Sequence, residues 1–224
     1  DNLQQFTTDW AAQQFGAAHA PAIASLLHTY TAHNGRRKPE AIEPDSYSIF
    51  HYGEAERIST ELAQAEALAD QLQQQLAPQL QDAYVQLVAH PLKASRAVFE
   101  LNRAVAMNQL HGQQGRASTN YWAEQVKFWF ETDAKLTAQY HALGNGRWNH
   151  MMSQPHIGFT YWRNPPANLM PVLSVASPMA VADMGVAAEG SAQSWPISEY
   201  RGEQLRLDTF YPHGQKQRQI DVFN

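Results

Sequence analysis

Two histidines in one proline-containing stretch are the first side chains whose type and spacing could carry chemistry. His150 and His156 lie on either side of Pro155. Imidazole nitrogens are common metal ligands, but two ligands do not complete a site and no carboxylate lies between them. We therefore expect these histidines to pack and hydrogen-bond within a buried irregular segment, with a shared metal ion as the alternative. No metal ion or other cofactor is predicted.

Aromatic side chains crowd the same stretch of sequence. Trp148, Phe159, Tyr161 and Trp162 are all found there. Flat aromatic faces can stack against sugar rings, and the same rings fill hydrophobic cores, so composition leaves both interpretations open. On the first interpretation Tyr161, together with the two histidines, is a candidate substrate-binding residue.

A basic triplet in a predicted loop is a second candidate site. Arg36 and Arg37 precede Lys38 and are followed closely by Glu40. Guanidinium groups bind carboxylates in a bidentate fork, so this loop could hold an acidic ligand such as a uronic acid. We list Arg36, Arg37 and Glu40 as candidate substrate-binding residues. The alternative is that the arginines pair with an acidic surface of a neighbouring domain.

A self-contained catalytic motif is not evident. The sequence lacks a glycine-rich phosphate loop, a Gly-x-Ser-x-Gly elbow and a His-Glu-x-x-His helix. Asp133 lies within an apolar helical stripe, where a raised pKa could make it an acid. A residue in this position more often pairs with a neighbouring helix or lies at the edge of the stripe, and we expect that role. Cysteine is absent, which excludes disulfides and thiol nucleophiles.

The elements that must position these residues are mainly helical. Apolar residues recur at helical spacing in five stretches, 8–32, 49–76, 80–89, 94–110 and 122–143. Thr8 or Asp9 is the predicted cap of the first helix, and Asn34-Gly35 its end. Pro91 is expected to break or kink the chain. The pattern predicts a bundle of four to five helices.

The remainder of the chain has a different pattern. Residues 146–171 hold no helical period, whereas 172–175, 185–191 and 219–224 are β-prone. The fold class is therefore mainly α: a helical bundle over 1–145, an irregular aromatic-rich linker over 146–171 and the start of a β-sandwich domain over 172–224. A strand at 219–224 would leave unpaired edges, so we expect the β-domain to continue beyond Asn224.

Charge and hydropathy exclude some partners. The formal net charge is −5, which does not favour nucleic acid. No apolar run reaches the roughly 18 residues that span a bilayer, and we expect no membrane association. The first residue is not Met, so we expect that the natural N-terminus has been removed.

Motifs along nearly the whole chain, in the same order, resemble the helical region of glycoside hydrolase family 115. The longest runs continuously from Trp148 to Trp162. The others are Trp10-Ala11, Gln14-Phe15-Gly16, Arg36-Arg37-Lys38-Pro39-Glu40, Tyr47-Ser48, Glu54-Ala55-Glu56-Arg57, Leu87-Val88, His90-Pro91-Leu92-Lys93-Ala94, Asn108, Gln114-Gly115-Arg116, Pro165-Pro166, Asn168, Met170-Pro171, Glu189-Gly190-Ser191, Trp195-Pro196 and Ile220-Asp221-Val222-Phe223-Asn224.

This resemblance implies a xylan α-1,2-glucuronidase, which removes glucuronic acid or its 4-O-methyl ether from glucuronoxylan with inversion. In the family the catalytic carboxyl groups lie on a (β/α) barrel that precedes the bundle, so no catalytic residue is assigned here and the chain alone is expected to be inactive. The expected partners are glucuronoxylan or its oligosaccharides, the barrel, and a second copy of the longer protein in a homodimer. The family also implies a secreted or periplasmic bacterial protein. A non-catalytic carbohydrate-binding or scaffold module is the alternative.

Overall fold

The computed structural model describes residues 2–160, 163–177, 180–181, 183–207, 209–214 and 216–224. By packing, the chain divides into two compact units, and each is assembled from separate stretches of sequence. The first unit comprises Asp1–Ile42, Arg57–Glu100 and Trp129–Met170. The second comprises Glu43–Glu56, Leu101–Phe128 and Pro171–Asn224. The predicted domain boundaries remain a prediction.

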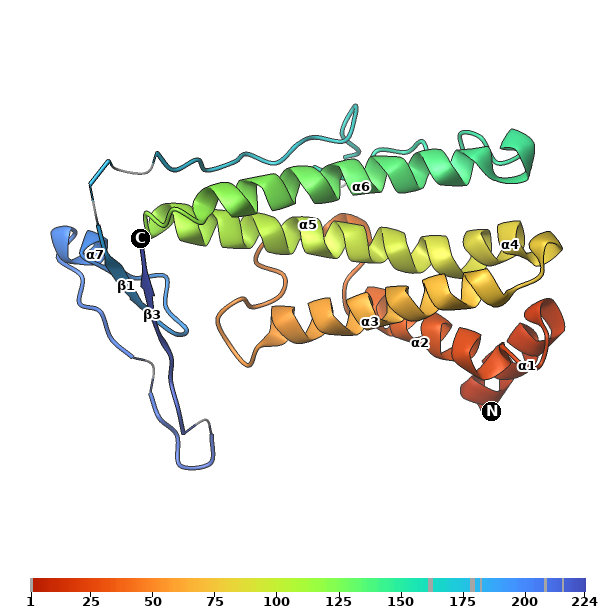
Figure 1. The fold of residues 1–224 in the computed structure, drawn as a ribbon, viewed down its shortest axis with the longest axis horizontal. Coiled ribbons are helices and arrows are strands. Elements are labelled where there is room, and N and C mark those ends of the chain that lie inside the picture. Colours follow the sequence, from red (N-terminus) through yellow and green to blue (C-terminus); the bar gives the residue numbers. More distant parts are fainter. Residues whose placement is uncertain (1, 161–162, 178–179, 182, 208, 215) are drawn as a thin grey trace. The chain divides into compact units, whose positions relative to one another are not determined.

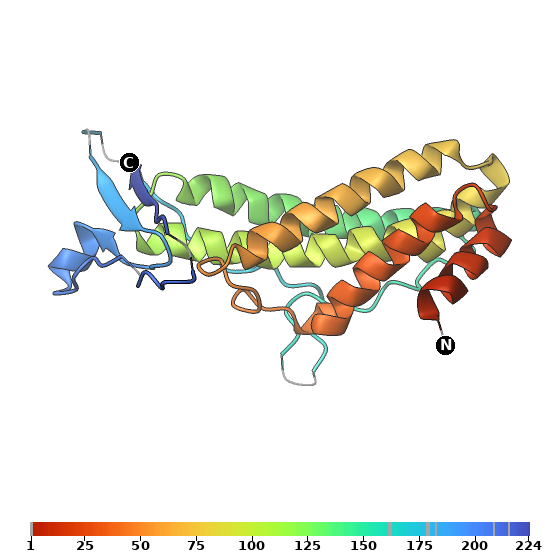
Figure 2. The ribbon, with the colours of Figure 1, turned by 90° about the horizontal axis from the view of Figure 1, so that it is seen from below.

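Two helices replace the single first helix that we expected. Helix α1 spans Leu3–Phe15 and α2 spans Ala20–Arg36, and Figures 1 and 2 show them side by side. Gly16, at φ 93°, ends α1 because few other residues adopt this conformation. The predicted cap was wrong too. The side chain of Asn2 accepts a hydrogen bond from the Gln5 backbone N at 3.1 Å, whereas Thr8 donates back to the Gln4 carbonyl from inside the helix.

The long helices differ from prediction at their ends and at Pro91. Helix α3 spans Glu54–Gln75, later than the predicted start near Ile49, and follows turns with Gly53 at φ 57°. Helix α4 spans Pro78–Tyr84, α5 spans His90–Gln113 and α6 spans Thr119–Gly146. Pro91 does not break the chain.

A π-helical turn, η2 at Val85–Ala89, joins α4 to α5 without leaving the helical region. The ring of Pro91 would crowd the carbonyl four residues earlier in an α-helix, and Pro91 has no N–H to donate. The wider π turn relieves both problems, which is why the helix continues through the proline.

The core of the first unit lies between α2, α3, α5 and the turn that joins α4 to α5. Tyr84 is fully buried and donates to the Ala69 carbonyl of α3 at 3.0 Å, while its ring meets Phe15 edge to face at 5.8 Å. Other large, fully buried side chains here are Ile23, Leu26, Leu62, Val88, Leu92 and Phe99. A short 3₁₀ turn, η1 at Pro39–Ala41, follows α2.

The second unit contains a small antiparallel sheet. Strand β1 spans Gly185–Ala188, β2 spans Ser194–Trp195 and β3 spans Ile220–Phe223, in the order β2-β1-β3. A short helix, α7, spans Ile197–Tyr200. The mainly α fold class with a small antiparallel sheet is confirmed, and so are the strand predictions around 185–188 and 220–223.

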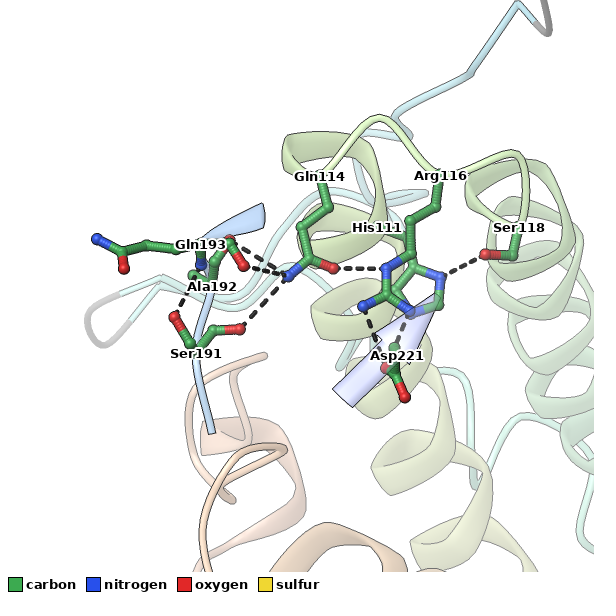
Figure 3. Close-up of polar contacts among 8 residues, drawn as sticks. All are labelled: His111, Gln114, Arg116, Ser118, Ser191, Ala192, Gln193 and Asp221. Carbon is green, nitrogen blue, oxygen red and sulfur yellow. Dashed lines mark hydrogen bonds and ion pairs between the residues drawn. The ribbon is translucent and has the colours of Figure 1, made fainter. Parts of the chain in front are cut away.

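A polar network centred on the buried Gln114 and Arg116 attaches this sheet to the turn between α5 and α6 (Figure 3). Arg116 donates through Nε to the Gln114 side chain at 2.6 Å and pairs with Asp221 of β3 at 3.2 Å. Its guanidinium group also lies 4.2 Å from the ring centroid of Phe223. Gln114 in turn donates to the carbonyls of residues 191–193 at 3.3–3.4 Å.

The predicted strand at 172–175 is not a strand. This segment is extended, but two asparagine side chains take the place of a neighbouring strand. Asn108 accepts from the Ser174 backbone N at 2.8 Å and donates to its carbonyl at 3.0 Å. Asn120 makes the same pair of bonds to Ala176, each at 2.9 Å.

Candidate functional site

A pocket of about 390 Å³ in the first unit brings together side chains that are far apart in sequence. Glu40 reaches it from η1, His90 from the start of α5, Asp133 from α6 and His156 from the irregular segment that follows α6. Concave sites lined by apolar surface and a few convergent polar groups are the usual form of ligand sites. We therefore treat this pocket as the candidate site.

An Asp133–His156 pair forms the polar centre of the pocket. His156 Nε2 lies 2.8 Å from Asp133 Oδ1, and the carboxylate side chain is 4% exposed. His156 Nδ1 faces the Gln154 carbonyl at 3.2 Å. Both of these partners are acceptors, so both ring nitrogens of His156 must carry protons to satisfy them. The geometry therefore favours the imidazolium form.

The surroundings of His156 also favour this charged form. The hydrogen bond that His156 donates to Asp133 is the main cause that raises the pKa of His156, and the charges of Asp133 and Glu40 add to it. Burial alone would lower the pKa of His156, but its effect is smaller than the sum of the others. His156 and Asp133 therefore form an ion pair in which the carboxylate is buried.

Asn168 braces the pair from the far end of the irregular segment. Its Oδ1 accepts from the backbone N of His156 at 2.8 Å and of Ile157 at 3.0 Å, and its Nδ2 lies 3.5 Å from Asp133 Oδ2. Leu169 N donates to the Ile157 carbonyl at 3.1 Å. These bonds close the base of the loop between Ile157 and Leu169 and fix the backbone that carries His156.

A second histidine in the pocket is held neutral. His90 is 7% exposed, and its ring centroid lies 4.6 Å from that of Tyr140. Burial is the main cause that lowers the pKa of His90, and it outweighs the opposing charge of Asp133.

The structure brings two of the six candidate residues into the pocket, Glu40 and His156. Arg36 and Arg37 do not line it. The Arg36 guanidinium lies 4.0 Å from the Glu61 carboxylate of α3, and Arg37 Nε donates to the Ala41 carbonyl at 2.6 Å. Their assignment to substrate binding remains a prediction.

The two predicted histidines have separate partners. His150 is exposed and faces Ser153 Oγ at 3.2 Å, whereas His156 is bound to Asp133. Among the residues that the structure describes, no group of three or more His, Cys, Asp or Glu side chains is placed to hold a metal ion. The sixth candidate, Tyr161, lies outside the described residues.

Sequence reasoning missed part of this site. The sequence indicated a partner for Asp133 because a carboxylate lay within an apolar stripe, but the partner is His156 rather than a residue of a neighbouring helix. Asn168 and Gln154 were not selected, because nothing in the pattern distinguishes an asparagine or glutamine that contacts other residues of an irregular segment from one that does not.

The chain is similar to known proteins in sequence and in fold. The family model described as glycosyl hydrolase family 115 matches residues 1–41. No curated protein matches the sequence. A solved structure described as a family GH115 4-O-methyl-α-glucuronidase, with specificity for decorated arabinogalactans, is similar in fold, with a TM-score of 0.53 and 18% sequence identity.

That similarity covers 81% of this chain and 24% of the solved chain, so the present chain spans about a quarter of the length of that protein. At this level of identity the match concerns the fold. The resemblance to glycoside hydrolase family 115 is thus confirmed by the family model over residues 1–41 and by the fold over most of the chain.

Proposed function

We propose that this chain is the helical region of a glycoside hydrolase that removes glucuronic acid or its 4-O-methyl ether from glucuronoxylan by inverting hydrolysis. The observation that carries the proposal is the agreement between the family 115 model and the fold of a family 115 4-O-methyl-α-glucuronidase. In this proposal the longer protein is secreted or periplasmic. No helix of the described residues is long and apolar enough to cross a membrane.

Inverting hydrolysis requires a carboxylic acid and a carboxylate roughly 6.5–9.5 Å apart, with a water molecule between them. Asp133 is a poor candidate for either role, because its two oxygens already face His156 and Asn168. As the family resemblance implies, the catalytic pair in our proposal belongs to a barrel outside this chain. The bundle packs against that barrel, and a homodimer of the longer protein is a further part of the proposal.

The first experiment incubates the longer enzyme with glucuronoxylan and follows the released sugar by proton NMR. We expect (4-O-methyl-)glucuronic acid to appear first as the β-anomer, because inversion of an α-linkage requires it. A decorated arabinogalactan, the polysaccharide named for the solved structure, is the alternative substrate and is assayed in parallel. Release of no uronic acid from either polysaccharide would contradict the proposal.

The role of the basic loop is tested in the same enzyme. Arg36→Met and Arg37→Met remove a guanidinium group from an exposed position. If either arginine binds the uronic acid carboxylate, we expect KM to rise about tenfold or more for acidic substrates, because a charge-assisted hydrogen bond contributes about 1.5–3 kcal/mol. An unchanged KM with lowered stability would show instead that the loop only supports the fold, as the Arg36–Glu61 contact would allow.

A further inference from the structure

We propose that the pocket lined by Glu40, Asp133 and His156 binds a neutral, hydroxyl-bearing sugar ring and excludes the carboxylate of a uronic acid. The biological role of this binding rests on the proposed function. In that role the pocket would be a subsite for an uncharged sugar residue of the polysaccharide. Binding itself is a property of the present chain and can be measured without the catalytic barrel.

The charge of the pocket argues against an acidic ligand. Asp133 and His156 form an ion pair that is close to neutral as a whole, because both ring nitrogens of His156 face acceptors. Glu40 adds one negative charge at an exposed position of the lining. No lysine or arginine is among the described residues that line the pocket. A bound carboxylate would meet Glu40 without a cation to compensate it.

The arginines that could reverse this charge make contacts elsewhere. Arg36 extends to Glu61 of α3, and Arg37 donates to a backbone carbonyl within its own loop. Even if the two arginines bind a uronic acid in the longer enzyme, they would do so outside the pocket. Any uronic acid bound by these arginines would therefore lie outside the pocket that we propose for an uncharged sugar.

The lining suits the two surfaces of a sugar ring. The apolar part comes from Pro39, Pro91, Met151 and Met152, against which the C–H face of a pyranose can pack. Gln154, Thr137 and the Glu40 carboxylate supply acceptors for hydroxyl groups. A volume of about 390 Å³ lies in the range of small-molecule sites, and it is sufficient for a single ring with space for a second.

The test is an NMR titration of the purified 224-residue chain with methyl xyloside, methyl arabinoside, methyl galactoside and methyl glucuronoside. We expect amide shifts at pocket residues with at least one neutral glycoside, with a millimolar dissociation constant, because a single ring buries little area. Methyl glucuronoside should bind at least tenfold more weakly than the preferred neutral glycoside.

Two variants and a matched control locate the binding. Glu40→Gln removes the charge at an exposed position, so we expect the neutral glycoside to bind several-fold more weakly while the glucuronoside gains affinity. Glu43→Gln is the matched control, because Glu43 is an exposed glutamate of the same connecting segment that does not line the pocket. Ala94→Phe places a ring in the pocket from α5 and should abolish binding, with circular dichroism used to verify the helical fold.

The proposal is overturned if no neutral glycoside shifts pocket amides, or if methyl glucuronoside binds more tightly than all three. It is also overturned if Ala94→Phe folds and still binds. These outcomes are distinct from failure of the proposed function, because hydrolysis by the longer enzyme is measured separately and does not depend on affinity in the isolated chain.

Discussion

At the scale of single residues, Asp133 and His156 show how two unremarkable side chains become a site. The carboxylate on α6 is buried, and burial of an unpaired charge is costly. His156 compensates it through a 2.8 Å hydrogen bond, and Asn168 fixes the backbone that carries the imidazole. The pair thereby holds the irregular segment against α6 and lines the pocket.

Replacing Asp133 by asparagine tests this arrangement. We expect the pKa of His156 to fall, because its hydrogen bond to the Asp133 carboxylate is the main cause that raises it. We also expect the free energy of unfolding to drop by about 1–3 kcal/mol. The loss should be largest below pH 6.5 and should shrink as the pH rises through the raised pKa of His156, where His156 loses its positive charge in the native chain. NMR titration and urea unfolding measure the two quantities.

Glu131→Gln is the control for this prediction, because Glu131 lies on the same helix with a side chain that is 65% exposed. It should change the stability by less than about 0.5 kcal/mol. A His156 pKa that stays the same in Asp133→Asn would contradict the assigned cause.

Buried neutral histidines predict the opposite pH dependence. Burial lowers the pKa of His33 and of His111 to about 4 in each case. On acidification from about pH 6.5 to pH 4, these two histidines take up protons in the unfolded chain but stay unprotonated in the folded chain. The free energy of unfolding therefore falls. Below pH 6.5, His33→Phe should weaken this dependence relative to the wild-type chain, as measured by urea unfolding at several pH values. An identical pH profile in the variant would contradict the role of His33.

At the scale of elements, close packing of a glycine decides how the extended segment 171–177 lies in the second unit. A Cβ on Gly112 of α5 would come within 2.7 Å of Ser174 Cβ. Ser174 is held there by Asn108, which is fully buried and bonds both to the Ser174 backbone and to the Thr119 carbonyl. The contact requires a residue without a side chain.

Gly112→Ala is therefore expected to destabilise the chain by about 1–3 kcal/mol, although alanine is the better helix former. Faster amide hydrogen exchange at Ser174 should accompany the loss. Gly35→Ala in α2 is the matched control, because nothing lies within 4 Å of a Cβ at Gly35, and it should be neutral or stabilise by up to about 1 kcal/mol. Equal effects of the two substitutions would show that the close approach to Ser174 does not matter.

The helix boundaries at this scale were predictable only in part. Apolar periodicity correctly indicated the long helices, because burial of one face is encoded locally in the spacing of apolar residues. It could not show that Gly16 divides the first helix or that the chain stays helical through Pro91. Both depend on a backbone conformation, a positive φ in one case and a π turn in the other.

At the scale of the whole molecule, the chain spans about a quarter of the solved relative, and the activity of the longer protein is a proposal. We expect purified residues 1–224 to release no glucuronic acid from glucuronoxylan, because in our proposal the catalytic carboxyl pair belongs to a barrel outside this chain. Ion chromatography of the reaction measures this. Release above that of a heat-denatured sample would show that the chain contains its own active site.

The sequence by itself determined the helical bundle, the short strands near 185 and 220, and the resemblance to glycoside hydrolase family 115. These are local properties: apolar spacing, strand alternation and contiguous motifs are all read along the chain. Only the tertiary structure showed that Glu40 and His156 share a pocket with Asp133, whereas Arg36 and Arg37 do not line it. Such a site depends on contacts between η1, α5, α6 and the irregular segment, and no spacing along one element encodes which side chains of another element it will meet.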